Sequence, residues 1–98
     1  MDLKKFTEKA QEALVGSQEL ARGMNHPQVD PEHLLTVLVE QPEGVVPGVL
    51  RRMNVDPRRV AAAARAALTR RPQVYGAGTP GLSPRLVAIV DLAQAEAA

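Results

Sequence analysis

Three segments of the chain share one order of residues: an apolar residue, a helix-capping residue, a proline, two further residues and a second apolar residue. They are VDPEHL at 29–34, VDPRRV at 55–60 and LSPRLV at 82–87. Asp and Ser side chains accept hydrogen bonds from the free amides of a helix's first turn. Proline is favoured at the first helical position because it has no amide to leave unsatisfied. Each segment therefore predicts a helix that begins at its proline.

Helical spacing of apolar residues completes the predicted layout. The five predicted helices run from about residue 6 to 23–25, from 31 through the apolar run 34–39, from 45 to 53, from 57 to 70 and from 84 to the end. The run at 34–39 is apolar nearly all round, which predicts that its helix is the most buried. Residues 71–81 hold three Gly and two Pro, so we expect a loop or extended linker there.

The core must be built almost without aromatic side chains. Hydrophobic residues make up 45% of the 98 residues, but aromatic residues only 2%, namely Phe6 and Tyr75. Leu, Val and Ala suit helix-on-helix packing, so we expect one all-α domain. The chain has no Cys, which excludes disulfides and thiolate metal sites. No apolar run approaches the roughly 20 residues that span a bilayer, so we expect a soluble, cytoplasmic protein without a membrane partner.

The charges are nearly balanced. Twelve Lys and Arg face eleven Asp and Glu, for a net charge of +1. This balance argues against a strongly nucleic-acid-binding domain. Residues 51–71 are nevertheless rich in arginine, and a small helical nucleic-acid-binding domain that uses this stretch remains an alternative function. The stretch has no aromatic residue to stack bases, which favours a solvated basic face over a nucleic-acid partner.

Glu32 and His33 look like part of a metal or acid–base site, but their context indicates a structural role. The helix starts at 55–60 and 82–87 have no histidine. Adjacent helical residues point about 100° apart, so Glu32 and His33 do not readily share a metal. His26 is separated from His33 by a proline and a predicted turn. We therefore expect His33 to be a packed third-position residue, and predict no metal site and no catalytic residue.

A weak internal repeat appears when the chain is compared with itself at an offset of 76 residues. Phe6–Ala10 then lies over Leu82–Leu86, as expected for one helical unit of about 75 residues followed by the opening helix of a second. Four stretches, KFTEKAQEAL, VDPEHLLTVLVEQPEG, RRMNVDPRRV and RRPQVYGAG, occur in this order. In sequence and spacing they resemble the N-terminal domain of Clp ATPases, and the RPQVYG segment favours the ClpB disaggregase branch of that family.

This resemblance implies an all-helical repeat domain that consists of the first four-helix repeat plus the opening helix of the second. The corresponding boundaries are a first repeat at 1–70, a linker at 71–82 and the truncated start of a second repeat at 83–98. No glycine-rich loop that ends in Gly-Lys-Ser/Thr occurs in the sequence, so we expect no nucleotide site and no enzyme activity here. ATP and Mg²⁺ would belong to a full-length, hexameric AAA+ parent.

The resemblance also implies a function and a site. ClpB-type domains engage exposed apolar segments of unfolded or aggregated proteins, through a groove beside the first helix of each repeat. Alignment assigns Thr7, Val90 and Leu92 to that groove. A partly built second repeat is expected to leave Leu86, Ile89 and Val90 uncovered and to promote self-association. The alternative within the family is a ClpC- or ClpA-like domain, whose partner is an adaptor or co-chaperone protein.

Overall fold

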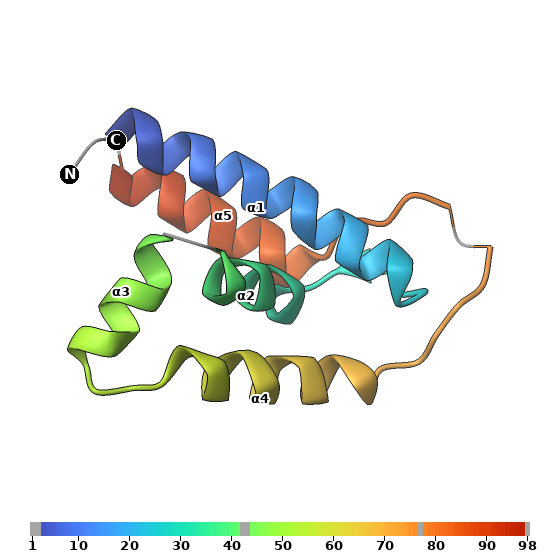
Figure 1. Ribbon diagram of the computed structural model, residues 1–98. Helices are drawn as coiled ribbons and strands as arrows, with labels where there is room; N and C mark the ends of the chain where they lie inside the picture. Colours follow the sequence, from blue (N-terminus) through green and yellow to red (C-terminus); the bar gives the residue numbers. More distant parts are fainter. Residues whose placement is uncertain (1–2, 42–43, 77, 98) are drawn as a thin grey trace.

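The computed structural model describes residues 3–41, 44–76 and 78–97, with side chains for all of these except 3–7, 93–94 and 96–97. The described residues form five helices and one short strand pair (Figure 1). These elements are α1 (Leu3–Gly23), β1 (Gln28–Val29), α2 (Pro31–Glu40), α3 (Val45–Arg52), α4 (Pro57–Thr69), β2 (Gly81–Leu82) and α5 (Pro84–Ala97). The predicted all-α class is confirmed, and the five helices match the predicted ones closely.

The helix starts at proline are confirmed in detail. At α4, the Asp56 carboxylate accepts the Arg58 amide at 2.9 Å. At α5, the Ser83 hydroxyl oxygen accepts the Leu86 amide at 3.2 Å. Each bond satisfies an amide in the first turn that has no partner within the helix. The start of α2 uses a different device, described with the histidines below.

Two helices end at an asparagine in the left-handed conformation. Asn25 after α1 has φ 58° and Asn54 after α3 has φ 61°. In both, the next residue's amide donates to a carbonyl five residues back, from His26 to Ala21 at 2.9 Å and from Val55 to Leu50 at 2.8 Å. This is the Schellman arrangement, in which Asn takes the place that Gly usually holds. It turns the chain sharply at each end.

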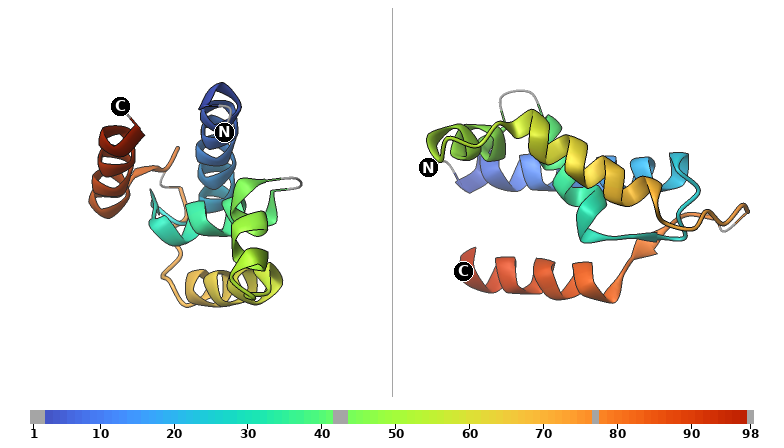
Figure 2. Two further views of the ribbon diagram at one scale, coloured as in Figure 1. Left: turned by 90° about the vertical axis from the view of Figure 1, so that its left-hand side faces the viewer. Right: turned by 90° about the horizontal axis from the view of Figure 1, so that it is seen from below.

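Helix α2 is the centre of the molecule, and the other four helices pack around it (Figure 2). The prediction that this helix is the most buried is confirmed, but its most buried residues are not the leucines of its apolar run. The buried positions of α2 are His33, Thr36 and Val39, whereas Leu35 is 40% exposed. These positions recur every three residues and form one stripe, because burial follows the helical period rather than composition.

The segment expected to be a loop or extended linker ends in a short strand. Residues Gly81–Leu82 pair in parallel with Gln28–Val29. Further bonds hold the segment to α1: the Gln18 side-chain amide donates to the Pro80 carbonyl at 2.9 Å, and the Val74 amide donates to the Asn25 carbonyl at 2.6 Å. Two residues are too few to show a strand period in sequence. The boundaries proposed at 70 and 82 stay predictions.

The core joins α1, β1 and α5. Ala21, Val29 and Leu86 are fully buried, and Leu34 and Val90 pack against them. Leu34 packs against the cluster that holds Val29, which forms a hydrophobic staple across the start of α2. The expectation that Leu86 and Val90 would lie uncovered was wrong, because α5 turns this side toward Val29.

Candidate functional site

Helix α5 directs apolar side chains toward solvent as well as toward the core. Leu86 is buried and Val90 half-buried, but Val87 is 42%, Ile89 47% and Leu92 64% exposed. A surface helix of a globular protein normally keeps its apolar residues in one stripe against the core. Exposed apolar residues that cluster on one element often mark a site of interaction.

The structure separates the predicted site residues. Val90 and Leu92 are two positions apart, about 200° around the helix, so Val90 faces the core and Leu92 faces solvent. Ile89, three residues before Leu92, shares its exposed face. We call Ile89 and Leu92 the α5 surface. Ile89 was not among the predicted site residues, although helical spacing from Leu92 would have indicated it.

The third predicted residue, Thr7, lies on the second turn of α1, but its side chain is outside the described residues. The first turns of α1 and the last turns of α5 lie at the same end of the molecule (Figures 1 and 2). The backbone arrangement thus places the segments that carry Thr7 and Leu92 at one end. The assignment of Thr7, Val90 and Leu92 to a groove stays a prediction.

Ion pairs fix the start of α5 to α2. The Glu32 carboxylate lies 3.0 Å from Arg85 of α5 and 2.9 Å from Arg71, and Arg71 also pairs with Asp30 at 2.8 Å. Burial alone would raise the pKa of Glu32. A backbone hydrogen bond and the two arginines outweigh burial, so the pKa lies below its ordinary value. Glu32 therefore stays charged and holds α5 in place.

The two histidines form a buried pair that sequence reasoning had kept apart. The Nδ1 of His26 lies 2.7 Å from the Nε2 of His33, although a proline and a turn separate them in sequence. The Nδ1 of His33 accepts the Asp30 amide at 2.9 Å. A histidine at the third helical position thus does what Glu or Gln does in a capping box.

This bonding fixes the proton on each ring. Since His33 Nδ1 is an acceptor, its Nε2 carries the proton and donates it to His26 Nδ1. The remaining nitrogen of His26 then carries the proton of that ring and lies toward the Leu68 carbonyl. Burial, then the charge of Arg71, lowers the pKa of His26, while burial, then His26 itself, lowers that of His33. His33 is fully buried, so its predicted packing role is confirmed.

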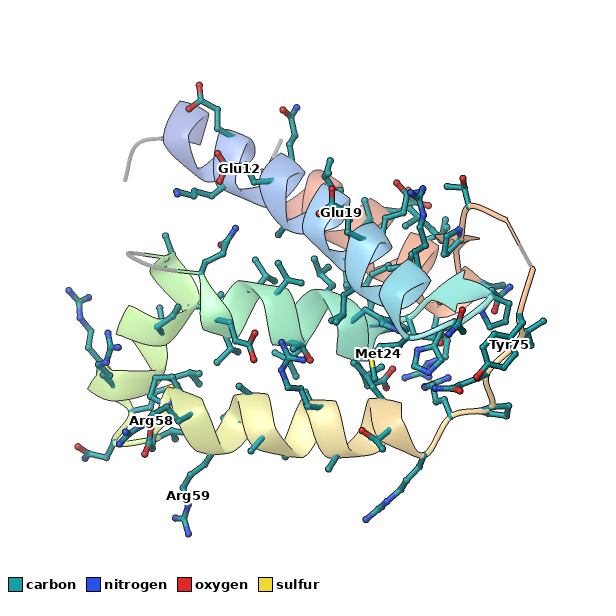
Figure 3. The ribbon with its side chains drawn as sticks, turned by 45° about the vertical axis from the view of Figure 1, so that its right-hand side comes forward. Glu12, Glu19, Met24, Arg58, Arg59 and Tyr75 are labelled. Atoms are coloured by element: carbon teal, nitrogen blue, oxygen red, sulfur yellow. The ribbon has the colours of Figure 1, made fainter. Side chains whose placement is uncertain are left out.

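The arginine-rich stretch is partly neutralised by carboxylates. Arg65 pairs with Glu40 through two contacts of 2.7 Å, and Arg71 is held by Asp30 and Glu32. Arg58 and Arg59 leave the start of α4 in different directions (Figure 3). The stretch therefore does not form one continuous basic face, which weakens the nucleic-acid alternative. In the described part of the chain, no helix is long and apolar enough to cross a membrane.

Comparison with known proteins agrees with this architecture. Residues 5–98 match the family described as the Clp repeat (R) N-terminal domain. The chaperone protein ClpB of Nitratidesulfovibrio vulgaris is 45% identical over 96% of the chain, and that of Bdellovibrio bacteriovorus is 42% identical over 94%. The chain spans only 11% of the length of either relative.

A solved structure supports the same assignment. The N-domain of ClpV from Vibrio cholerae superposes with a TM-score of 0.75 and 26% identity, over 96% of this chain and 58% of that one. The matched region is an N-terminal domain and not the ATPase module. The chain therefore belongs to the Clp N-terminal repeat domain family, and it is similar to the N-terminal part of ClpB chaperones.

Proposed function

We propose that this chain is the substrate-engaging N-terminal module of a ClpB-like, ATP-dependent protein disaggregase. It binds exposed apolar segments of unfolded or aggregated proteins. The observation that carries the proposal is the α5 surface, where Ile89 and Leu92 are 47% and 64% exposed on a helix whose opposite side is in the core. The similarity to ClpB chaperones supports the same function.

The physical logic favours weak and promiscuous binding. Unfolded chains have no common sequence, but they share exposed apolar side chains. A small apolar surface without specific polar contacts recognises this property. A contact of this size gives low affinity for one copy, and several copies in a ring raise the overall affinity through effective concentration. We propose a hexameric, cytoplasmic parent in which other modules bind ATP and Mg²⁺ and perform hydrolysis.

The test is a titration of the chain with a permanently unfolded, apolar-rich protein, at low and at high salt. The same protein in its folded form is the control. We expect weak binding to the unfolded form that survives high salt, because apolar contacts are not screened. Binding that high salt abolishes would favour phosphate or charge recognition and contradict the proposal.

Adaptor binding is distinguished in the same assay. If the chain shows no preference for the unfolded over the folded form, direct capture of clients is excluded. The adaptor-binding role of a ClpC- or ClpA-like domain would then replace it, with an adaptor or co-chaperone protein as the partner.

A further inference from the structure

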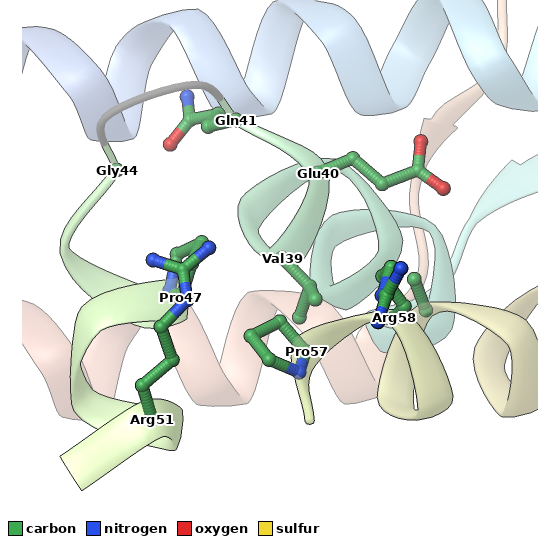
Figure 4. Close-up of a pocket in the computed structure, with 9 residues that line it drawn as sticks. Val39, Glu40, Gln41, Gly44, Pro47, Arg51, Pro57 and Arg58 are labelled. Carbon is green, nitrogen blue, oxygen red and sulfur yellow. The ribbon is translucent and has the colours of Figure 1, made fainter. Parts of the chain in front are cut away.

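A second surface lies on the other side of α2 from α5. The end of α2, the α3 helix and the start of α4 enclose a hollow of about 330 Å³ (Figure 4). Its apolar lining comes from Val39, Pro47, Pro57 and Ala61, of which all but Pro57 are buried. This volume is at the low end of the range of roughly 300–1,000 Å³ for ligand pockets. The hollow has room for one apolar side chain and a little backbone.

The described side chains that line the hollow carry a net positive charge. Among the described lining residues the acidic side chain is Glu40, which is compensated by two contacts of 2.7 Å with Arg65. The hydrogen bond from Arg65 outweighs burial and lowers the pKa of Glu40, so this carboxylate stays ionised and paired. Arg51 and Arg58 also line the hollow and are exposed. They place two guanidinium groups beside an apolar floor.

The contact that Arg58 makes within the protein is weak. Its Nε lies 3.4 Å from Asp56, and the side chains are 92% and 41% exposed. Exposed pairs of this kind contribute little to stability. A carboxylate from another molecule can therefore compete with Asp56 for Arg58. Asp56 itself stays in place because its carboxylate also caps α4 through the Arg58 amide.

We propose that this hollow binds a short acidic and apolar segment of a partner protein. One apolar side chain of the segment lies on the floor formed by Val39, Pro47, Pro57 and Ala61, and neighbouring Asp or Glu carboxylates pair with Arg51 and Arg58. Charge complementarity selects the acidic residues, and the apolar floor selects the residue between them. The partner is thus recognised by its sequence, an apolar residue between acidic residues, and not by being unfolded.

A nucleic acid fits this surface less well. The described lining contains no aromatic side chain on which a base could stack. Arg65 and Arg71, which would extend the basic surface along α4, are already paired with carboxylates. Two guanidinium groups over an apolar floor match a peptide better than a chain of phosphates. Binding of an oligonucleotide is kept as an outcome of the test.

The probe is a labelled synthetic peptide with Glu-Leu-Glu in a Gly/Ser background, and binding is measured by fluorescence anisotropy. Two control peptides carry Lys-Leu-Lys or Glu-Ser-Glu instead. We expect the Glu-Leu-Glu peptide to bind most tightly, because only it satisfies both the arginines and the floor. Equal binding of the Glu-Ser-Glu peptide would show that charge alone is recognised and would overturn the proposal.

Neighbouring residues of the chain provide matched charge controls. Arg51→Glu and Arg58→Glu reverse a charge at the hollow, whereas Arg52→Glu and Arg59→Glu make the same change at exposed positions outside its lining. We expect the first pair to weaken peptide binding about tenfold and the second pair to change it less than about twofold. Equal losses in both pairs would contradict a site at the hollow.

A further pair of variants tests the floor without any change of charge. Ala61→Leu fills the hollow, while Ala62→Leu adds the same volume at an exposed position of α4. Only Ala61→Leu is expected to abolish binding, and circular dichroism checks that each variant folds. If Ala61→Leu does not fold, Asp56→Asn tests the proposed site through its charge instead. This variant keeps the helix cap, frees Arg58 from its partner and should tighten peptide binding. Unchanged or weaker binding by Asp56→Asn would overturn the proposal.

Two results separate this site from the proposed function. Leu92→Ser should leave binding of the Glu-Leu-Glu peptide unchanged, because Leu92 lies on α5. Competition with a single-stranded oligonucleotide checks the other class of partner. If the oligonucleotide displaces the peptide and shows the same dependence on Arg51 and Arg58, the hollow is a nucleic-acid site and the proposal of a protein partner is wrong.

Discussion

The buried histidine pair shows how single residues hold this fold together. Three of the four ring nitrogens are hydrogen-bonded: His33 Nδ1 accepts the Asp30 amide, and His33 Nε2 donates to His26 Nδ1, while the last nitrogen of His26 lies toward the Leu68 carbonyl. The pair thereby connects the start of α2 with the end of α4. This requires both rings to be neutral, since a protonated ring has no acceptor nitrogen.

The neutral pair predicts a loss of stability in mild acid. In the unfolded chain each histidine titrates near its ordinary pKa of about 6.5. In the folded chain both pKa values are lower, so on acidification the unfolded state takes up protons first. The free energy of unfolding is therefore constant above about pH 7 and falls below about pH 6.5, by at most about 1.4 kcal/mol per pH unit for each histidine. Urea denaturation at about pH 7.5 and about pH 5.5 measures this change, before the carboxylates titrate.

His33→Gln provides the control for this experiment. Glutamine at the third helical position can still accept the Asp30 amide, as in a capping box, but it does not titrate. We expect a folded variant whose stability depends less on pH than that of the parent chain. A parent whose stability stays level or rises between pH 7.5 and 5.5 would contradict the neutral-pair account.

At this scale the sequence predicted the role of one histidine but not the partnership of the two. His33 stands at the third position of a clear helix start, so burial and a structural role follow from local rules. The contact with His26 depends on the turn at Asn25, whose left-handed conformation sends the chain back toward α2. The path of the chain after Asn25 is set by tertiary packing, so no spacing of residues in the sequence indicates that the two histidines meet.

At the scale of elements, local rules predicted the helices well. Proline and a capping residue mark the starts of α2, α4 and α5, and asparagine marks the ends of α1 and α3. Only the β1–β2 pair was missed, because Gly81–Leu82 adopts a strand through its partner and not through its own pattern. The sequence of a segment is enough to indicate a helix, whereas it does not indicate pairing between strand residues 53 positions apart.

Two glycines inside helices provide a matched prediction about packing. A Cβ at Gly48 of α3 would meet no described atom within 4 Å, whereas a Cβ at Gly16 of α1 would lie 3.2 Å from Val37 Cγ1. Gly48→Ala should raise the free energy of unfolding by about 0.5–1 kcal/mol through its helix propensity. Gly16→Ala should gain less or lose stability, because α1 packs closely on α2 there. Chemical denaturation compares the two, and an equal gain would show that Gly16 does not set the distance between the helices.

At the scale of the whole molecule, α2 is surrounded by helices while α5 is attached along one side. Leu86 and Val90 provide the apolar attachment, and Arg85 with Glu32 the polar one. Amides open more readily where few buried contacts hold them. We therefore expect slow hydrogen exchange in α2 and faster exchange in the part of α5 that follows Val90. Exchange measured by NMR or mass spectrometry should show this order, and equal protection of both helices would contradict it.

The candidate site could be located from the sequence only in part. The resemblance to Clp N-terminal domains directed attention to α5, and Leu92 is indeed exposed there. The same alignment grouped Val90 with Leu92, although the helical period places them on different sides. No pattern in the sequence marks the hollow, because its lining is brought together from the end of α2, from α3 and from the start of α4.

The most direct test of the proposed function compares Leu92→Ser with Val49→Ser in binding to the permanently unfolded protein. Leu92 lies on the α5 surface, while Val49, 47% exposed, lies on α3 at the other side of α2. Loss of one apolar contact should weaken binding about tenfold for Leu92→Ser, and Val49→Ser should leave it unchanged. If both variants bind as the parent chain does, or if both lose affinity equally, the α5 surface is not where unfolded proteins bind.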